Sequence, residues 1–263
     1  MTALKSMKNI LIFIALVGIG VGIWYGGRLL TEPASDTHIL PGMEVAAGEM
    51  QYMEEGRYYT ATVSYPAHTP LGASADKKAR DIMEMYVQND IAEFKKNINA
   101  DQSSGPEKAM LNSTGRTYTY DAKYKQYAGA DSRLISYEYA VYIDTGGAHP
   151  NGFFKTFIFG TEGNEVKLSD LFQPESDYLQ RISTIALADV KQQLSERLGK
   201  DASASIFAEG LAPTEENFSN FVIDGDTLVI FISSYQAAAY AAGTFEIRIP
   251  LSQFSDILRP EWK

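Results

Sequence analysis

Residues 144–152 read Asp-Thr-Gly-Gly-Ala-His-Pro-Asn-Gly and lie between two segments, 133–143 and 153–159, whose composition predicts β-strands. Three glycines, a proline and an asparagine within nine residues are typical of a tight turn. We therefore expect this turn to join the two central strands and to form a rigid, exposed feature of the fold.

Strand and helix patterns alternate on both sides of this turn. Tyrosine-, threonine- and valine-rich runs predict strands, and an Asp224-Gly225-Asp226 hairpin signal joins two of them. Apolar residues at three- and four-residue steps predict two one-sided helices. The expected strands are 57–65, 118–127, 133–143, 153–159, 218–223, 227–233 and 244–249, and the expected helices are 74–99 and 174–198.

This order predicts an α+β fold, in which an antiparallel sheet has the two amphipathic helices packed on one face. Ser74 is the expected N-cap of the first helix, Pro174 suits the first turn of the second, and Gly199 is placed to end it. The side of segment 133–143 that carries Ser136 and Glu138 is expected to be half exposed.

The amino-terminal segment predicts a membrane anchor. Residues 10–25 carry no charge, two lysines precede them, and Trp24 and Tyr25 suit a membrane interface. A cleaved signal peptide is the alternative, but no clean small-x-small cleavage site follows. We expect a single-pass signal anchor at 9–28, with residues 1–8 in the cytoplasm and the carboxy-terminal part outside the cell membrane. Residues 29–55, with Pro33 and Pro41, are interpreted as a linker.

The composition excludes several classes of function. The 263 residues include no cysteine, which excludes disulfides and thiolate chemistry. Three of the 23 basic residues precede Glu32, so the remainder carries 20 basic and 33 acidic side chains, a net charge of −13. Such a surface disfavours nucleic acid and favours solubility or a cationic partner. No cofactor motif, phosphate loop or metal-ligand spacing is recognisable.

Several stretches resemble known bacterial families. Residues 58–98 resemble the domain of unknown function DUF4163. The segment 136–172, with GGAHPNG followed by LSDLF, resembles DUF3298, as does the later motif YQAAAYAAG at 235–243. The expected domains are therefore 56–130, similar to DUF4163, and 131–263, similar to DUF3298. At Ser234 and Ala239 the sequence departs from the family, where we expect proline.

The resemblance implies an extracytoplasmic binding or sensing domain. One relative of this kind is a membrane-bound anti-sigma factor that senses lysozyme by binding it. Another relative has the domain in front of a peptidoglycan deacetylase domain. We expect the binding module here without either output, with peptidoglycan or a lysozyme-like cationic protein as its partner.

His149 allows three interpretations: backbone hydrogen bonds that fix the loop, contact with a ligand, or catalysis together with Asp144. A metal site would need more ligands than the dispersed histidines supply. Tyr235 and Tyr240 lie among alanines, where a tyrosine either packs under the sheet or acts as an exposed recognition anchor. The predicted ligand-binding residues are Asp144, Gly146, Gly147, His149, Asn151, Ser234, Tyr235 and Tyr240.

Two other classes of function remain open at this point. A cell-wall hydrolase would need two carboxyl groups at a defined separation, which the sequence does not identify. A non-catalytic structural protein of the cell envelope would need no small ligand at all. We expect a binding module rather than an enzyme.

Overall fold

The computed structural model describes residues 44–46, 48–98, 115–199, 202 and 205–262. The segment expected to cross the membrane lies outside these residues. Among the helices that the structure describes, none combines the length and the apolar composition of a membrane span.

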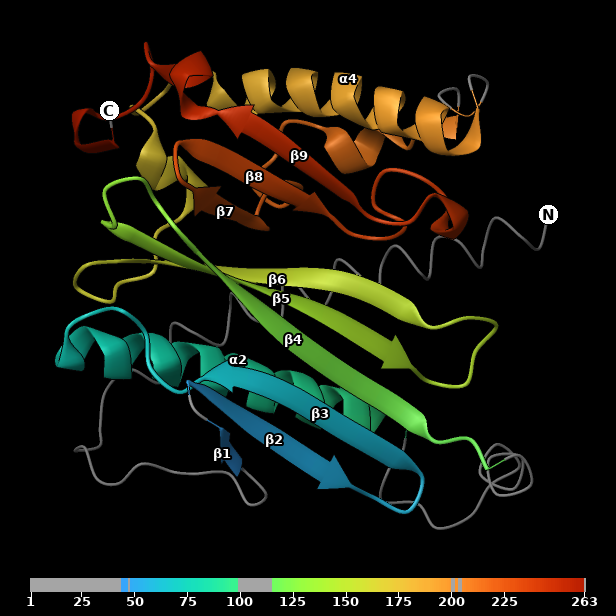
Figure 1. Ribbon diagram of the computed structural model, residues 1–263. Coiled ribbons are helices and arrows are strands. Elements are labelled where there is room, and N and C mark those ends of the chain that lie inside the picture. Colours follow the sequence, from blue (N-terminus) through green and yellow to red (C-terminus); the bar gives the residue numbers. More distant parts are fainter. Residues whose placement is uncertain (1–43, 47, 99–114, 200–201, 203–204, 263) are drawn as a thin grey trace. The chain divides into compact units, whose positions relative to one another are not determined.

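Two sheets and two long helices make up the described part of the chain (Figure 1). A six-stranded sheet has the order β1-β2-β3-β4-β5-β6, and a three-stranded sheet has the order β7-β8-β9. The strands are β1 (Glu44–Ala46), β2 (Glu49–Glu55), β3 (Tyr59–Pro66), β4 (Tyr118–Ala128), β5 (Leu134–Asp144), β6 (Asn151–Gly160), β7 (Phe221–Asp224), β8 (Thr227–Ile232) and β9 (Phe245–Pro250). The long helices are α2 (Ala73–Asn97) and α4 (Tyr178–Leu198), with short 3₁₀ turns at Leu168–Leu171, Ala208–Leu211, Tyr240–Ala242, Leu251–Phe254 and Pro260–Trp262.

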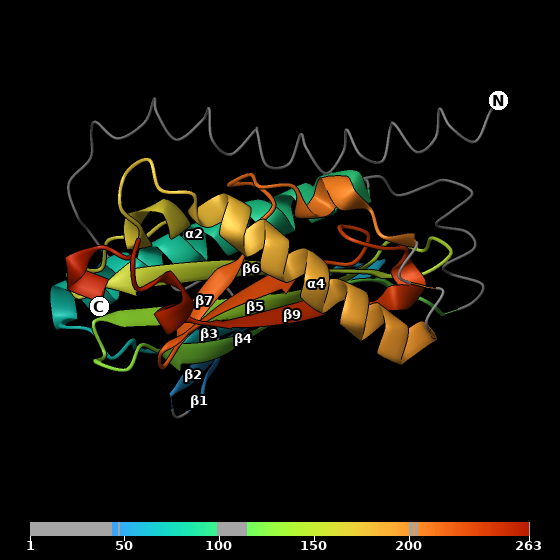
Figure 2. The same ribbon diagram turned by 90° about the horizontal axis from the view of Figure 1, so that it is seen from above.

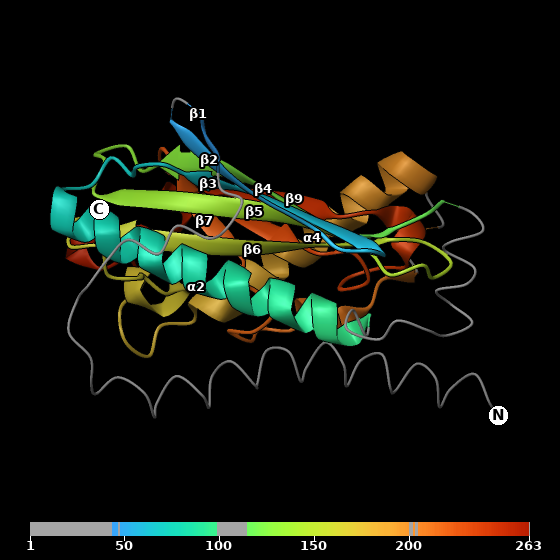
Figure 3. The same ribbon diagram turned by 90° about the horizontal axis from the view of Figure 1, so that it is seen from below.

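The α+β prediction with a mostly antiparallel sheet and two helices is confirmed. The exception is the β3–β4 pair, which is parallel. Its cause is the crossover through α2, because a strand that follows a long helix can return in the same direction as the strand before it. Figure 3 shows α2 lying across the larger sheet.

The two helices do not share one face of one sheet, so that part of the prediction is wrong. Helix α2 packs on one side of the larger sheet through Ala79, Met83, Val87, Ile91 and Phe94. Helix α4 packs on the smaller sheet, and the smaller sheet covers the other side of the larger one (Figures 1 and 2). The described part of residues 44–262 is therefore layered as helix, sheet, sheet and helix.

The face of β5 that was expected to be half exposed is buried for the same reason. Ser136 is fully buried, and its hydroxyl accepts a hydrogen bond of 3.2 Å from the Ile223 amide of β7. The Thr156 hydroxyl of β6 accepts one of 3.0 Å from the Phe221 amide. These two hydroxyls satisfy the outer edge of β7, which would otherwise present open backbone donors.

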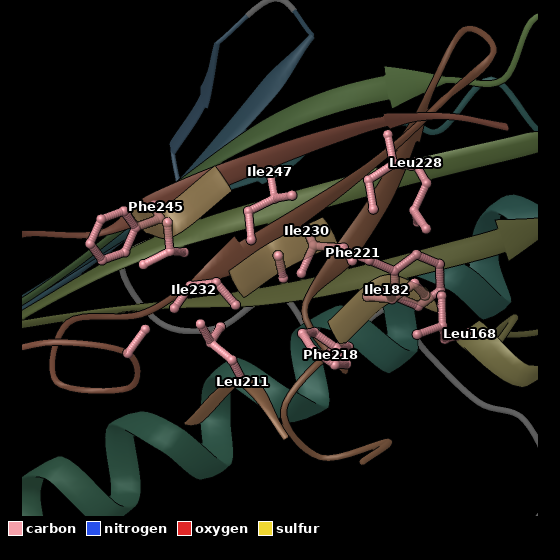
Figure 4. Packing of buried hydrophobic residues seen from close by; sticks show 14 of the residues in the cluster. Leu168, Ile182, Leu211, Phe218, Phe221, Leu228, Ile230, Ile232, Phe245 and Ile247 are labelled. Atoms are coloured by element: carbon pink, nitrogen blue, oxygen red, sulfur yellow. The ribbon is translucent and has the colours of Figure 1, made fainter. Parts of the chain in front are cut away.

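The smaller sheet and α4 enclose an aliphatic and aromatic core. Its labelled members in Figure 4 come from the smaller sheet, from α4 and from the segments that flank α4. They are Leu168, Ile182, Leu211, Phe218, Phe221, Leu228, Ile230, Ile232, Phe245 and Ile247. This core fixes the ends of β8 and β9, which residues 233–244 connect.

Three local predictions need correction. Residues 49–55 are not linker, because they form β2 and pair along their whole length with β3. Gly72 rather than Ser74 is the N-cap of α2, and the Asp76 carboxylate closes the turn by accepting the Thr69 amide at 2.6 Å. Helix α4 begins at Tyr178 rather than at Pro174, because Glu175 has a left-handed backbone with φ 61°.

Candidate functional site

The turn between β5 and β6, residues 145–150, is called the histidine loop here. Asp144, the last residue of β5, holds the start of this loop. Its carboxylate accepts a hydrogen bond of 2.8 Å from the Gly146 amide and pairs with the Arg116 guanidinium at 2.9 Å. Gly146 has φ +76°, and a Cβ at this position would lie 3.2 Å from the Tyr118 ring. A glycine is therefore required at this point of the turn.

The other predicted residues in or beside the histidine loop make local contacts or are simply exposed. Asn151 is the first residue of β6, and its side-chain oxygen accepts the Gly152 amide at 3.0 Å. Gly147 is exposed. Asp144 binds Arg116 and Gly146, whereas the His149 ring contacts Pro150 and a second loop.

The second loop, residues 233–244 between β8 and β9, is called the tyrosine loop. Gln236 fixes its first half, because its side-chain amide donates to the Gly210 and Asn217 carbonyls at 3.0 and 2.8 Å. Arg197, at the end of α4, donates to the Ala242 and Thr244 carbonyls at 2.9 and 2.7 Å. Both ends of the loop are thus tied to neighbouring elements.

Small residues let the tyrosine loop pack closely. Ala237 and Ala238, within the loop, are buried. A Cβ on Gly210 would lie 1.8 Å from the Gln236 carbonyl oxygen, so only glycine fits beside this part of the loop. Ser234, another predicted site residue, is partly exposed and lies at the start of the loop.

The two loops meet at the same end of the sheets and bring three rings together. His149 stacks on Tyr240, with ring centroids 3.9 Å apart and an angle of 12° between the planes. The Tyr235 hydroxyl lies 2.6 Å from Nε2 of His149, and its ring centroid is 5.6 Å from that of Tyr240. His149 and Tyr235 are 86 residues apart in sequence, and together with Tyr240 they form what we call the aromatic cluster.

The aromatic cluster is accessible to solvent and lies on two loops that are held by hydrogen bonds. His149 is exposed, Tyr235 is 37% exposed, and Tyr240 is partly exposed. Tyr235 has φ 69°, a left-handed backbone that is unfavourable for an aromatic residue. Such strain persists only where the surrounding structure fixes the backbone, as the hydrogen bonds of the neighbouring Gln236 do here. The arrangement can stack on a flat or ring-shaped group and offer it a hydroxyl group.

The sequence predicted the members of this cluster but not its supports. Arg116, Arg197, Gln236 and Gly210 hold the two loops. Gln236 was part of the quoted tyrosine motif, but nothing in that motif indicated its partners. The basic residue in the last turn of α4 suggests only a favourable interaction with helix carbonyls.

Two carboxyl groups elsewhere have raised pKa values. Burial raises the pKa of Asp90 to about 6, although the Tyr120 hydroxyl donates to it at 2.5 Å. Burial also raises the pKa of Glu138, which accepts from the Tyr127 hydroxyl at 2.7 Å. Asp90 lies on the α2 side of the larger sheet and Glu138 on the side of β7–β9. These two carboxyls therefore do not form a catalytic pair.

A site for a metal ion would need several ligands close together. Within the described residues, no group of three or more histidines, cysteines or carboxylates is placed to hold one. The aromatic cluster consequently stands as the candidate site on the strength of its own geometry.

Comparison with known proteins identifies two matching family models. Residues 169–252 match the protein of unknown function DUF3298, and residues 53–152 match the model described as deacetylase PdaC. The second match covers the region in which the sequence resembles DUF4163 and includes the histidine loop. The tyrosine loop lies within the first match.

Individual relatives agree with these matches. The chain is 28% identical over 214 residues to the peptidoglycan-N-acetylmuramic acid deacetylase PdaC of Bacillus subtilis, covering 80% of this chain and 41% of that protein. It is 27% identical over 203 residues to the immunogenic protein MPB64 of Mycobacterium bovis, covering 76% of this chain and 78% of that one. The chain thus spans less than half of the deacetylase.

A solved structure shows the same fold. A DUF3298 family protein of Pseudomonas aeruginosa aligns with a TM-score of 0.51 at 13% identity, covering 81% of this chain and 95% of that one. At this level of identity the likeness concerns the fold alone. The family resemblance found in the sequence is confirmed by these matches taken together. Residues 169–252 of the chain therefore match the DUF3298 family, and residues 53–152 match the deacetylase PdaC family.

Proposed function

We propose that this chain is a membrane-anchored, extracytoplasmic binding or sensing module whose ligand is a cell-wall glycan. The observation that carries the proposal is the aromatic cluster, in which two separate loops hold three rings in one exposed, fixed arrangement. Aromatic rings offer a large contact area with little side-chain entropy to lose, which suits recognition. Similarity to a peptidoglycan deacetylase over 80% of this chain, and a deacetylase PdaC family match that includes the histidine loop, support a ligand from the cell wall.

The direct test is cosedimentation of the full chain with purified, insoluble peptidoglycan. We expect Tyr235→Ala and Tyr240→Ala to weaken binding at least tenfold, because each removes a ring from the contact surface. Met85→Ala is the matched control, since Met85 is 41% exposed on α2 and lies on the other side of the larger sheet. Absence of sedimentation, or equal sedimentation of all four proteins, would refute the proposal.

A lysozyme-like cationic protein is the second candidate ligand, and the net charge favours it. Residues 32–263 carry 20 basic and 33 acidic side chains, which would attract a basic protein over a distance set by the ionic strength. The test is binding of the chain to hen lysozyme at low and at high salt. If the chain binds lysozyme strongly at low salt, loses it at high salt and does not sediment with peptidoglycan, the ligand is a cationic protein rather than a glycan.

The amino-terminal segment is part of the same proposal. Residues 9–28 would anchor the chain in the membrane, with residues 48–262 outside the cytoplasm. In cell fractionation, we expect the chain to stay in the membrane pellet after a high-salt wash and to be degraded by protease added outside spheroplasts. Recovery in the soluble cytosolic fraction would contradict the anchor.

The hydrolase alternative receives no support from the carboxyl groups with raised pKa values, which lie on opposite sides of the larger sheet. A structural role in the envelope predicts that Tyr235→Ala leaves every binding measurement unchanged. The same cosedimentation experiment therefore separates the binding module from the structural protein.

A further inference from the structure

The hydrogen bonds of His149 determine where its proton lies. Nδ1 is 3.0 Å from the Pro150 carbonyl oxygen, and a carbonyl oxygen can only accept. Nδ1 must therefore carry the proton of the neutral ring. Nε2 is then an acceptor, and the Tyr235 hydroxyl, 2.6 Å away, must donate to it.

The direction of the hydrogen bond from Tyr235 to His149 determines which hydrogen-bonding group the cluster offers to a ligand. A phenol has one hydrogen, and Tyr235 uses it on His149. The Tyr235 oxygen then has no hydrogen left to donate to a ligand, so through its outer lone pair it can only accept a hydrogen bond. The matching ligand group is a hydrogen-bond donor, such as the hydroxyl or amide N–H of an amino sugar, placed beside the stacked His149 and Tyr240 rings.

Protonation of His149 would reverse this polarity. A second proton occupies Nε2, so that the Tyr235 oxygen has to accept from the ring and its own O–H turns away from His149. The outer lone pair that accepted from the ligand is then replaced by a donor. A ligand donor would face another donor, and the contact would be lost.

Histidine is also the group best placed to introduce charge at this surface. The histidine loop 145–150 and the tyrosine loop 233–244 contain no aspartate, glutamate, lysine or arginine. The charged groups attached to them are already engaged, since Asp144 pairs with Arg116 and Arg197 binds two carbonyls. Besides the two tyrosines, His149 is the side chain of these loops that can gain or lose a proton.

We propose that the aromatic cluster recognises a hydrogen-bond donor of the ligand through Tyr235 and that this recognition requires neutral His149. Binding at the site is then linked to pH, stronger when His149 is neutral and weaker when it is protonated. This inference rests on the proposed function, because it concerns the same site and ligand.

Two measurements test it on the full chain. The first is ¹⁵N NMR of selectively labelled histidine, with the three histidines assigned by variants; we expect Nδ1 of His149 to carry the proton at neutral pH. The second is peptidoglycan cosedimentation from about pH 8 to about pH 5, a range that spans histidine titration. We expect binding of the wild type to fall about fivefold to tenfold, the value of one hydrogen bond.

Variants identify the residue responsible. In His149→Gln the side-chain oxygen can still accept from Tyr235 but cannot be protonated, so the pH dependence should disappear whatever the affinity. His68→Gln is the matched control, because His68 is exposed and lies 3.8 Å from Asp76, away from both loops. This control should keep the pH dependence of the wild type.

The inference is overturned if NMR places the proton on Nε2 at neutral pH, or if His149→Gln keeps the wild-type pH dependence. Absence of binding at every pH would refute the proposed function and, with it, the ligand contact assigned here. The NMR measurement would still decide the hydrogen-bond polarity of Tyr235 in that case, so the two failures are distinguishable.

Discussion

Tyrosines occupy two contrasting kinds of site in this molecule. In the larger sheet, tyrosine hydroxyls donate to carboxylates, as Tyr59 does to Glu54 at 2.5 Å and Tyr120 to Asp90 at 2.5 Å. In the aromatic cluster, Tyr235 meets a histidine instead, on an exposed surface and with a left-handed backbone. The tyrosine–carboxylate contacts of the larger sheet join strands to each other and to α2. The contact between Tyr235 and His149 instead keeps a residue with a strained backbone at the solvent-exposed surface.

The difference shows that residue type alone does not identify a site. The chain has 16 tyrosines, and most described ones lie in strands and are buried. What distinguishes Tyr235 is the combination of exposure, backbone strain and a partner from a distant loop. Stability should therefore depend on the sheet tyrosines and their carboxylates, and binding on the aromatic cluster.

The largest expected effect on stability concerns Glu54. Its carboxylate accepts hydrogen bonds from Tyr52, from Tyr59 and from Lys95 of α2, and thereby fixes the β2 strand. Glu54→Ala should lower the free energy of unfolding by about 3 kcal/mol, because three partners lose their acceptor. Urea unfolding measures this.

Asp81→Ala is the control for Glu54, since Asp81 makes an exposed ion pair with Lys77 that should contribute less than about 1 kcal/mol. Peptidoglycan binding of Glu54→Ala at a temperature where it is folded should equal that of the wild type. Equal stability of both variants would contradict the structural role of this cluster.

The second largest expected effect is on the pH dependence of the unfolding free energy, through the Asp90 carboxyl. Burial raises its pKa to about 6, so the folded state favours the protonated carboxyl. Its contribution to stability is present below about pH 4 and is lost as the pH rises through about 6. Relative to Asp90→Asn, the wild type should lose about 2 kcal/mol of unfolding free energy between pH 4 and pH 7. A constant difference between the two proteins across this range would exclude the raised pKa.

The third effect concerns the strain at Tyr235. Glycine adopts φ 69° without steric cost, whereas alanine keeps the strain. Tyr235→Gly should therefore be about 1 kcal/mol more stable than Tyr235→Ala, while both lose binding. Thermal unfolding of the pair checks this. If the alanine variant were the more stable one, the left-handed backbone would not be a source of strain.

The smallest expected effect on stability comes from removing the hydroxyl of Tyr65, which is buried against α2. Its hydroxyl has no hydrogen-bond partner among the described residues, so burying it carries a desolvation cost. Tyr65→Phe should be as stable as the wild type or up to about 1 kcal/mol more stable. Tyr120→Phe is the opposite case, since it removes the donor to Asp90 and should destabilise. A clear loss of stability in Tyr65→Phe would show that its hydroxyl has a partner.

Local sequence patterns predicted most elements of the fold, because strands and amphipathic helices leave periodic signals. The packing of the smaller sheet on the larger one could not be predicted in this way, because it produces no periodic pattern in the sequence. Ser136, Thr156 and Glu138 are polar, and only the edge of β7 and the Tyr127 hydroxyl explain why they can be buried. Strand β2 was missed because its flanking proline- and glycine-containing sequence resembles a linker, whereas its pairing depends on distant β3.

The candidate site was predictable as two separate loops but not as one surface. Glycines and proline marked the histidine loop, and alanines marked the tyrosine loop. Their meeting depends on the antiparallel return of β6 and on the position of β8 and β9 over the larger sheet. The backbone strain of Tyr235 is a property of the folded chain and has no counterpart in its composition.

The central claim is that the aromatic cluster is the surface that binds a cell-wall glycan. The most direct measurement is an NMR titration of the full chain with soluble peptidoglycan fragments, following assigned backbone amides. The account predicts that the largest shifts fall on residues 145–150 and 233–244, around His149, Tyr235 and Tyr240. Shifts confined elsewhere, for example to the groove formed by Asp177, Arg181 and Gln253, would contradict it.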